Sequence, residues 1–94
     1  MPKGSSDAET ARFFKGLGTH IRQLRERAGY SQEDMILFGY TVRYWQRVEG
    51  GKPITLRTLL RICRIFGVPM HDVVRGLGPK GTALQSVRAK GTTV

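Results

Sequence analysis

The chain has 94 residues, the size of one small domain, and carries 16 Lys and Arg against 7 Asp and Glu. The net charge of +9 favours a polyanionic partner, above all nucleic acid, although a basic surface that only maintains solubility is the alternative. A single cysteine, Cys63, excludes an intramolecular disulfide, and the lack of a long apolar stretch or signal-peptide core leads us to expect a cytoplasmic protein.

Composition divides the chain into three segments. The polar, glycine-containing start predicts a flexible N-terminal arm over residues 1–10, and the Gly-, Thr- and Ser-containing end predicts a flexible basic tail over residues 78–94. Between them, residues 11–77 carry the apolar periodicity of a folded domain. This domain is itself basic, so the positive charge is not confined to the tail.

The first predicted helix begins as early as Ser6, which has capping-box spacing to Glu9, and it ends at Gly29. Its apolar positions recur in steps of three and four residues, the period of one helix face. These positions are Phe14, Leu17, Ile21, Leu24 and Ala28. Gly16 and Gly18 weaken the early part of this pattern, because glycine is a poor helix former.

Two short helices follow, separated by a tight turn. Ser31 has the character of an N-cap, and acidic residues after it predict a helix of about two turns that ends near Gly39. Thr41 caps the next helix, which runs from Val42 to Glu49 and ends at Gly50-Gly51. The polar edge of its one tryptophan is expected to reach the surface. The inward face of this helix is predicted to be Val42, Trp45 and Val48.

Two further helices complete the predicted fold. The fourth follows an extended Pro53-Ile54-Thr55 segment and ends at Gly67, with Arg57, Arg61 and Arg64 outward. Its apolar face is predicted to be Leu56, Leu59, Leu60, Cys63 and Phe66. The fifth begins at Pro69, and its apolar face is Met70, Val73, Val74 and Leu77. The fold class is therefore all-α, a compact bundle of about five short helices that contains a helix-turn-helix.

The two short helices are joined by a glycine-containing turn, and the second has a basic outer face. This arrangement allows the second helix to lie in the major groove of DNA. The sequence resembles the phage-repressor-like helix-turn-helix proteins of the Cro/C1 or XRE type over roughly residues 17–77. The resemblance implies a lambda-repressor-like DNA-binding domain that forms two-fold dimers on palindromic sites. It rests on Ile21-Arg22, Leu24-Arg25, Gly29-Tyr30-Ser31-Gln32, Gly39, Val48-Glu49, Gly51-Lys52, Thr55-Leu56, Leu59-Leu60-Arg61-Ile62 and Phe66-Gly67-Val68.

The resemblance also implies roles for individual residues. Arginine suits base reading, because its fork donates two hydrogen bonds to guanine. The implied base-reading residues are Val42, Arg43, Tyr44, Gln46 and Arg47. The implied phosphate contacts, made through backbone and side-chain donors, are Ser31, Gln32, Thr41, Gly51, Lys52 and Thr55. Arg25 and Glu49 match the family's internal ion pair, which ties the first helix to the end of the reading helix.

The sequence departs from the family pattern in the second helix. It has one residue fewer between Gln32 and Gly39, and Met35 or Ile36 stands where a small residue is usual. A bulky residue there predicts a changed helix crossing or a changed turn. The loop after Glu49 also looks short, so the base-reading positions are assigned to within one residue.

Several of these residues also have an ordinary structural interpretation. Arg43 and Arg47 can be a merely solvated pair, although their place after the turn favours DNA contact. Trp45 lies on the inward face, which favours core packing over base stacking, and Tyr44 lies off that face with its contact left open. Cys63 has the character of a buried hydrophobe.

We predict a sequence-specific double-stranded DNA-binding transcription regulator, a repressor, that acts as a homodimer on a palindromic operator. The dimer interface is expected at Met70, Val73, Val74 and Leu77, because this helix is more apolar than a small core requires. The alternatives are a protein-interaction module or antitoxin-type partner that binds nucleic acid non-specifically, and an RNA or single-strand binder. His20, His71 and Cys63 lack the spacing of a zinc or nucleophilic site, so no metal, cofactor or enzymatic activity is predicted.

Overall fold

The computed structural model describes residues 3–78, with side chains from Asp7 onward, and contains five helices and no strand within that range. This confirms the predicted all-α bundle. The elements are α1 (Lys3–Arg27), the 3₁₀ helix η1 (Glu33–Phe38), α2 (Val42–Glu49), α3 (Leu56–Phe66) and α4 (Met70–Val73). The predicted tail lies outside the described residues apart from Gly78.

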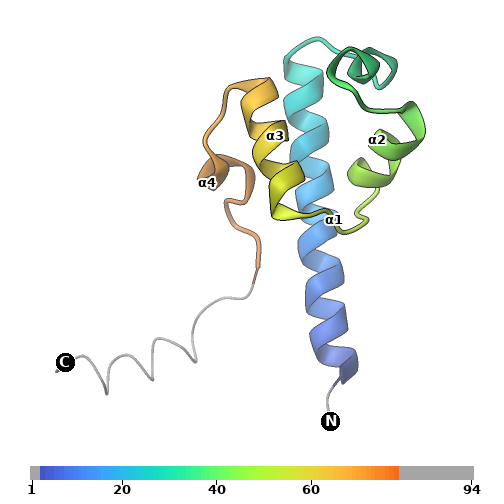
Figure 1. Cartoon of the computed structure of the whole chain (residues 1–94). Coiled ribbons are helices and arrows are strands. Elements are labelled where there is room, and N and C mark those ends of the chain that lie inside the picture. Colours follow the sequence, from blue (N-terminus) through green and yellow to red (C-terminus); the bar gives the residue numbers. More distant parts are fainter. Residues whose placement is uncertain (1–2, 79–94) are drawn as a thin grey trace, which may run out of the picture.

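Helix α1 is the central element of the bundle. Helices η1 and α2 lie on one side of it, and α3 and α4 lie on the other (Figure 1). It begins at Lys3, so the segment predicted as an arm is helical in its described part. This N-terminal half of α1 projects beyond the bundle, and residues 7–12 are exposed (Figure 1).

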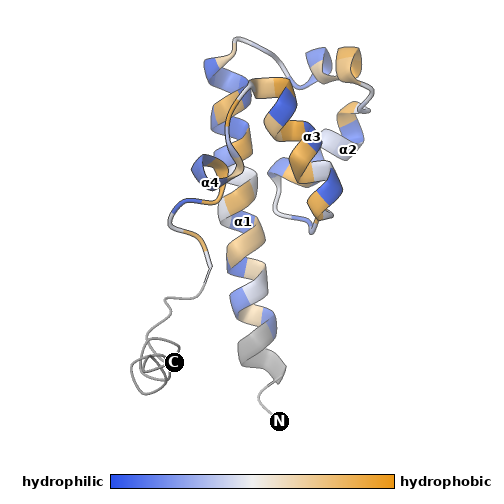
Figure 2. Ribbon diagram, turned by 60° about the vertical axis from the view of Figure 1, so that its left-hand side comes forward, coloured by the Kyte–Doolittle hydropathy of each residue, from blue (hydrophilic) through white to orange (hydrophobic). Residues whose placement is uncertain are grey.

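Among the described residues, ten buried hydrophobic side chains from all five elements and their connections form one core. Hydrophobic and hydrophilic stretches alternate along α1 and α3, as expected of helices with one face in a core (Figure 2). The four side chains with no measurable exposure are Ile21, Met35, Trp45 and Ile62. The others are Leu17, Tyr40, Val48, Leu59, Cys63 and Val73.

The buried face of α3 differs from the predicted one. Its buried residues are Leu59, Ile62 and Cys63, at steps of three and one, whereas Leu56 is 66% exposed and Leu60 is 45% exposed. The prediction for Leu56 and Leu60 is therefore wrong. The seven apolar residues of α3 allow two overlapping apolar faces, and only the docking of α3 on α1 decides which face is buried.

The first helix of the helix-turn-helix is a 3₁₀ helix. Such a helix rises about 2.0 Å per residue, so the six residues of η1 span roughly 12 Å, for which an α-helix needs about eight residues. This tighter winding compensates for the shortened segment between Gln32 and Gly39. Met35 is fully buried while Ile36 is 59% exposed, so Met35 is the bulky residue that enters the core.

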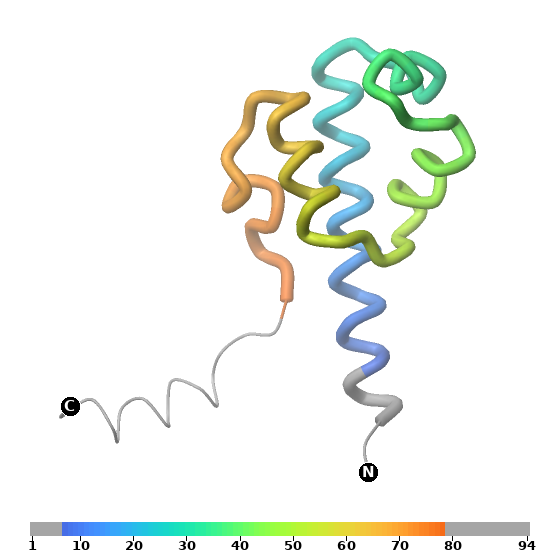
Figure 3. The backbone as a smooth tube through the Cα atoms, in the orientation of Figure 1, coloured from blue at the N-terminus to red at the C-terminus, as the bar shows by residue number. Residues whose placement is uncertain are grey.

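Helix α4 is a single turn, shorter than predicted. The chain then passes through Gly76, whose φ is +75°, and runs back toward the N-terminal half of α1 (Figure 3). Leu77 lies against Gly16 there. Val73 is only 2% exposed, and Met70, Val74 and Leu77 pack against the core, so the burial of Val73 removes it from the predicted dimer interface.

Candidate nucleic-acid interface

Helix α2 is amphipathic, with a buried and an exposed face. The Thr41 hydroxyl caps its start by accepting a hydrogen bond from the Tyr44 backbone N–H at 3.0 Å. Trp45 and Val48 are buried, and Val42 is half-buried. The opposite face presents three exposed side chains, which are Arg43, Gln46 and Arg47.

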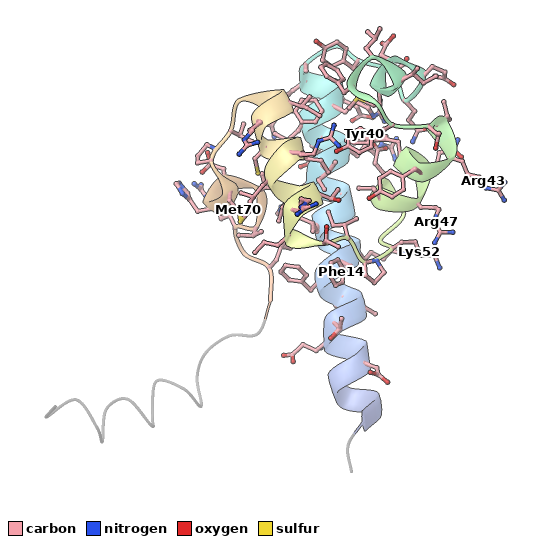
Figure 4. The ribbon with its side chains drawn as sticks, in the orientation of Figure 1. Phe14, Tyr40, Arg43, Arg47, Lys52 and Met70 are labelled. Atoms are coloured by element: carbon pink, nitrogen blue, oxygen red, sulfur yellow. The ribbon has the colours of Figure 1, made fainter. Side chains whose placement is uncertain are left out.

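Three cationic side chains point away from the bundle on this side of the molecule. Figure 4 shows Arg43, Arg47 and Lys52 directed outward from α2 and from the loop that follows it. All three are exposed, and within the described part of the chain no ion pair holds them. Their charges are therefore available to an external anion.

Tyr44 is half-buried and is held by an aromatic stack. Its ring lies parallel to that of Tyr40, with centroids 5.6 Å apart and an interplanar angle of 11°. Arg61 lies over the Tyr40 ring at 5.2 Å and donates a hydrogen bond to the Phe38 carbonyl at 3.3 Å. The stack covers one face of Tyr44 and restricts it to contact through its other face or its hydroxyl. The spacing of residues in the sequence does not indicate this role of Tyr40 and Arg61.

The loop after α2 corrects one expected phosphate contact. The Gly51 N–H donates to the Val48 carbonyl at 3.2 Å, and the Lys52 N–H donates to the Arg47 carbonyl at 3.0 Å. This is a Schellman motif, and it uses the positive φ of Gly51, +98°. Gly51 therefore has no free donor for a phosphate, and only the side chain of Lys52 remains available.

Three hydroxyls among the expected phosphate contacts also cap helices. Ser31 accepts a hydrogen bond from the Asp34 N–H at 3.1 Å, while the Asp34 carboxylate accepts from the Ser31 N–H at 2.7 Å. Thr55 accepts from the Thr58 N–H at 3.1 Å, as Thr41 does for α2. All three capping residues are exposed, so their hydroxyls fix the helix starts at the surface.

The carboxylate of Glu49, at the end of α2, is buried and accepts hydrogen bonds from several side chains. Arg25 donates to it from Nε at 2.6 Å and from Nη2 at 3.0 Å, and the two side chains are 9% and 5% exposed. The indole N–H of Trp45 also donates to Glu49. The expectation that this polar edge reaches the surface is wrong, because Glu49 satisfies the N–H inside the core. Arg25 further donates to the Tyr30 carbonyl at 2.8 Å.

Gln32 connects η1 to α2. Its amide nitrogen donates to Glu49 at 3.0 Å, and its amide oxygen accepts from Gln46 at 3.4 Å. An amide nitrogen carries two hydrogens, so one donor of Gln32 remains for an external acceptor. The side chain that the resemblance assigns to a phosphate is thus held in place by α2.

The environment of Glu49 favours its charged form. Burial by itself would raise the pKa of Glu49, but hydrogen bonds from Arg25, Gln32 and Trp45 outweigh burial, and the pKa lies below its ordinary value of 4.5. The hydrogen bond to Glu49 likewise raises the pKa of Arg25, against the effect of burial. The ion pair is therefore fully charged at neutral pH.

This shift predicts a loss of stability in acid. In the window between the lowered pKa of Glu49 and 4.5, the unfolded state binds more protons than the folded state, so the free energy of unfolding rises with pH. The contribution is complete above that window and is lost as the pH falls through the lowered pKa. Urea unfolding of wild type and Glu49→Gln across this range tests it, and an equal pH slope in the two proteins would contradict the assignment.

Gly18 of α1 packs directly against the C-terminal end of α2. A Cβ atom at Gly18 would lie 2.6 Å from the Glu49 carbonyl oxygen and 2.7 Å from that of Val48. The two backbones therefore approach each other as closely as only glycine allows. The sequence signal was present, because a glycine inside a strong helical pattern points to close packing. Our sequence-based prediction uses Gly18 only as a residue that weakens the helix.

A helix-turn-helix domain family model matches residues 16–75. The chain belongs to the helix-turn-helix domain family. The match includes η1 and α2, and it is consistent with the resemblance to XRE- and Cro-type proteins. No curated protein and no solved structure matches the chain. Among the described residues, no helix is long and apolar enough to cross a membrane, and no three His, Cys, Asp or Glu side chains are grouped to hold a metal.

Proposed function

We propose that this helix-turn-helix protein is a sequence-specific regulator of transcription that reads the major groove of duplex DNA with α2. The observation that carries the proposal is the exposed face of α2, where Arg43 and Arg47 stand one turn apart without a described ion-pair partner. Two arginines at this spacing point in one direction. Each can donate two hydrogen bonds to a guanine edge.

The core supports this use of α2 by holding the helix rigidly. Trp45 and Val48 anchor its inner face, and Glu49 joins its last turn to Arg25 and Gln32. Lys52 lies beside the outer face, where its charge can meet a phosphate (Figure 4). A rigid helix with a positive outer face provides both the position and the affinity that groove reading requires.

The proposal extends to a homodimer on a palindromic operator, with repression through occupation of a promoter. An α2 of eight residues reaches only a few base pairs, and a second copy supplies an equivalent helix for the neighbouring half-site. Two-fold symmetry of the protein then imposes a palindrome on the DNA.

Selection of bound duplexes from a random pool tests this function. We expect a palindromic motif whose half-site centres lie about 10 base pairs apart, or a multiple of that distance. Affinity for the motif is expected to fall steeply between about 50 and 200 mM salt, as counterions compete for the phosphates. Salt-sensitive binding without any enriched motif would contradict sequence-specific reading and support a non-specific nucleic-acid binder.

A further inference from the structure

Two exposed leucines lie on α3 beside an apolar hollow. Leu56 and Leu60 are four residues apart, so they share one face of the helix, and they are 66% and 45% exposed. Leu56 also forms part of the rim of a hollow of about 180 Å³. The remaining apolar lining comes chiefly from Phe13, Phe14, Ile54, Met70 and Val74.

The hollow is large enough for an aliphatic side chain. A cavity of roughly 150 Å³ accepts a benzene molecule, and this one is larger. The residues around it come from α1, the loop before α3, the start of α3 and α4, and Figure 4 labels two of them, Phe14 and Met70. A protruding leucine and a hole of matching chemistry therefore lie next to each other on one face.

We infer that this face is the contact between two copies of the chain, in which Leu56 of each copy enters the hollow of the other. A two-fold contact requires one surface patch to be complementary to itself. The exposed Leu56 side chain beside the apolar hollow meets this requirement. The inference deepens the dimer part of the proposed function, on which it rests. It keeps Met70 and Val74 of the interface expected around α4, which line the hollow, and leaves out Val73, which is buried.

Two charged residues that are close in sequence to the lining residues favour the same partner. Glu9 lies one helical turn from Phe13 on the projecting half of α1, and Arg57 follows Leu56. Both are exposed, and neither belongs to an ion pair within the described residues. When Leu56 of one copy fills the hollow of the other, Arg57 comes toward the partner's Glu9, and symmetry forms this pair twice.

Sedimentation equilibrium without DNA tests the inference. We expect wild type to dimerise, and Leu56→Asp to weaken self-association at least tenfold without loss of helical content, because Leu56 is exposed in the single copy. The matched control is Leu37→Asp on η1, which changes a leucine that is 77% exposed and is not among the residues around the hollow, and this variant is expected to dimerise as wild type does. A monomeric wild type, or equal dimerisation of both variants, would overturn the inference.

A second test uses charge and covalent trapping. Arg57→Glu is expected to weaken the dimer, and Glu9→Arg with Arg57→Glu to restore it. Oxidation of a mixture of Leu56→Cys and Val74→Cys proteins is expected to give a disulfide between the two variants, while Cys63 stays buried and unreacted. No trapped pair and no restoration would refute the contact. A dimer that passes these tests but selects no DNA motif would contradict the proposed function alone.

Discussion

Replacement of Glu49 by alanine is expected to lower the free energy of unfolding by about 3–5 kcal/mol, because it leaves the buried Arg25 without its counter-charge. The same change removes the acceptor of the Trp45 indole N–H and of the Gln32 amide. Urea unfolding followed by circular dichroism measures the loss. The free energy of unfolding of a small domain is itself only a few times larger than this loss, so we expect the variant to be partly unfolded at 37 °C.

An exposed ion pair provides the matched control for Glu49. Arg22 and Glu26 also lie 3.0 Å apart, but their side chains are 62% and 51% exposed, so Glu26→Ala is expected to cost no more than about 1 kcal/mol. Replacement of both buried partners, Arg25→Met with Glu49→Leu, is expected to recover much of the stability. Equal losses from Glu49→Ala and Glu26→Ala would show that the buried pair has no special role.

Replacement of Gly18 by alanine is expected to destabilise the fold by about 1–2 kcal/mol, although alanine is the better helix former by about 1 kcal/mol. The reason is that the new Cβ meets the backbone carbonyls of Glu49 and Val48 at distances no side-chain rotation can relieve. The end of α2 must then move away from α1. The fluorescence of Trp45, the only tryptophan, is expected to change, because its indole N–H donates a hydrogen bond to Glu49 at the end of α2 that packs on Gly18.

Gly16 provides the control for Gly18 on the same helix. A Cβ there would lie 2.6 Å from Cδ2 of Leu77, the far end of a flexible side chain that can turn away. We therefore expect Gly16→Ala to leave stability unchanged or to raise it by up to about 1 kcal/mol. Unchanged Trp45 fluorescence and stability in Gly18→Ala would contradict the close approach of the two backbones.

The sequence alone was sufficient to predict much of the fold, because the helix ends depend on local chemistry. Thr41 and Thr55 each accept a hydrogen bond from the N–H three residues later, and glycines in the left-handed region follow α3 and η1. These signals predicted Val42 to Glu49 and the fourth helix closely. They depend on neighbouring residues, so no knowledge of the tertiary structure was needed.

Features that depend on tertiary packing could not be predicted in the same way. The 3₁₀ form of η1 accompanies the burial of Met35, and the exposure of Leu56 and Leu60 follows from how α3 docks on α1. The spacing of residues does not contain this information. The occupied N–H groups of Gly51 and Lys52 likewise became visible only with the Schellman motif in place.

Repetition of the random-pool selection with Arg43→Ala and Arg47→Ala tests the central claim, that α2 reads bases, most directly. The control is Arg64→Ala, which removes an exposed arginine of α3 that lies outside the proposed dimer contact. We predict that each α2 variant loses base preference at specific positions in both half-sites, while the Arg64→Ala control keeps the wild-type motif. An unchanged motif in both α2 variants would contradict base reading by α2.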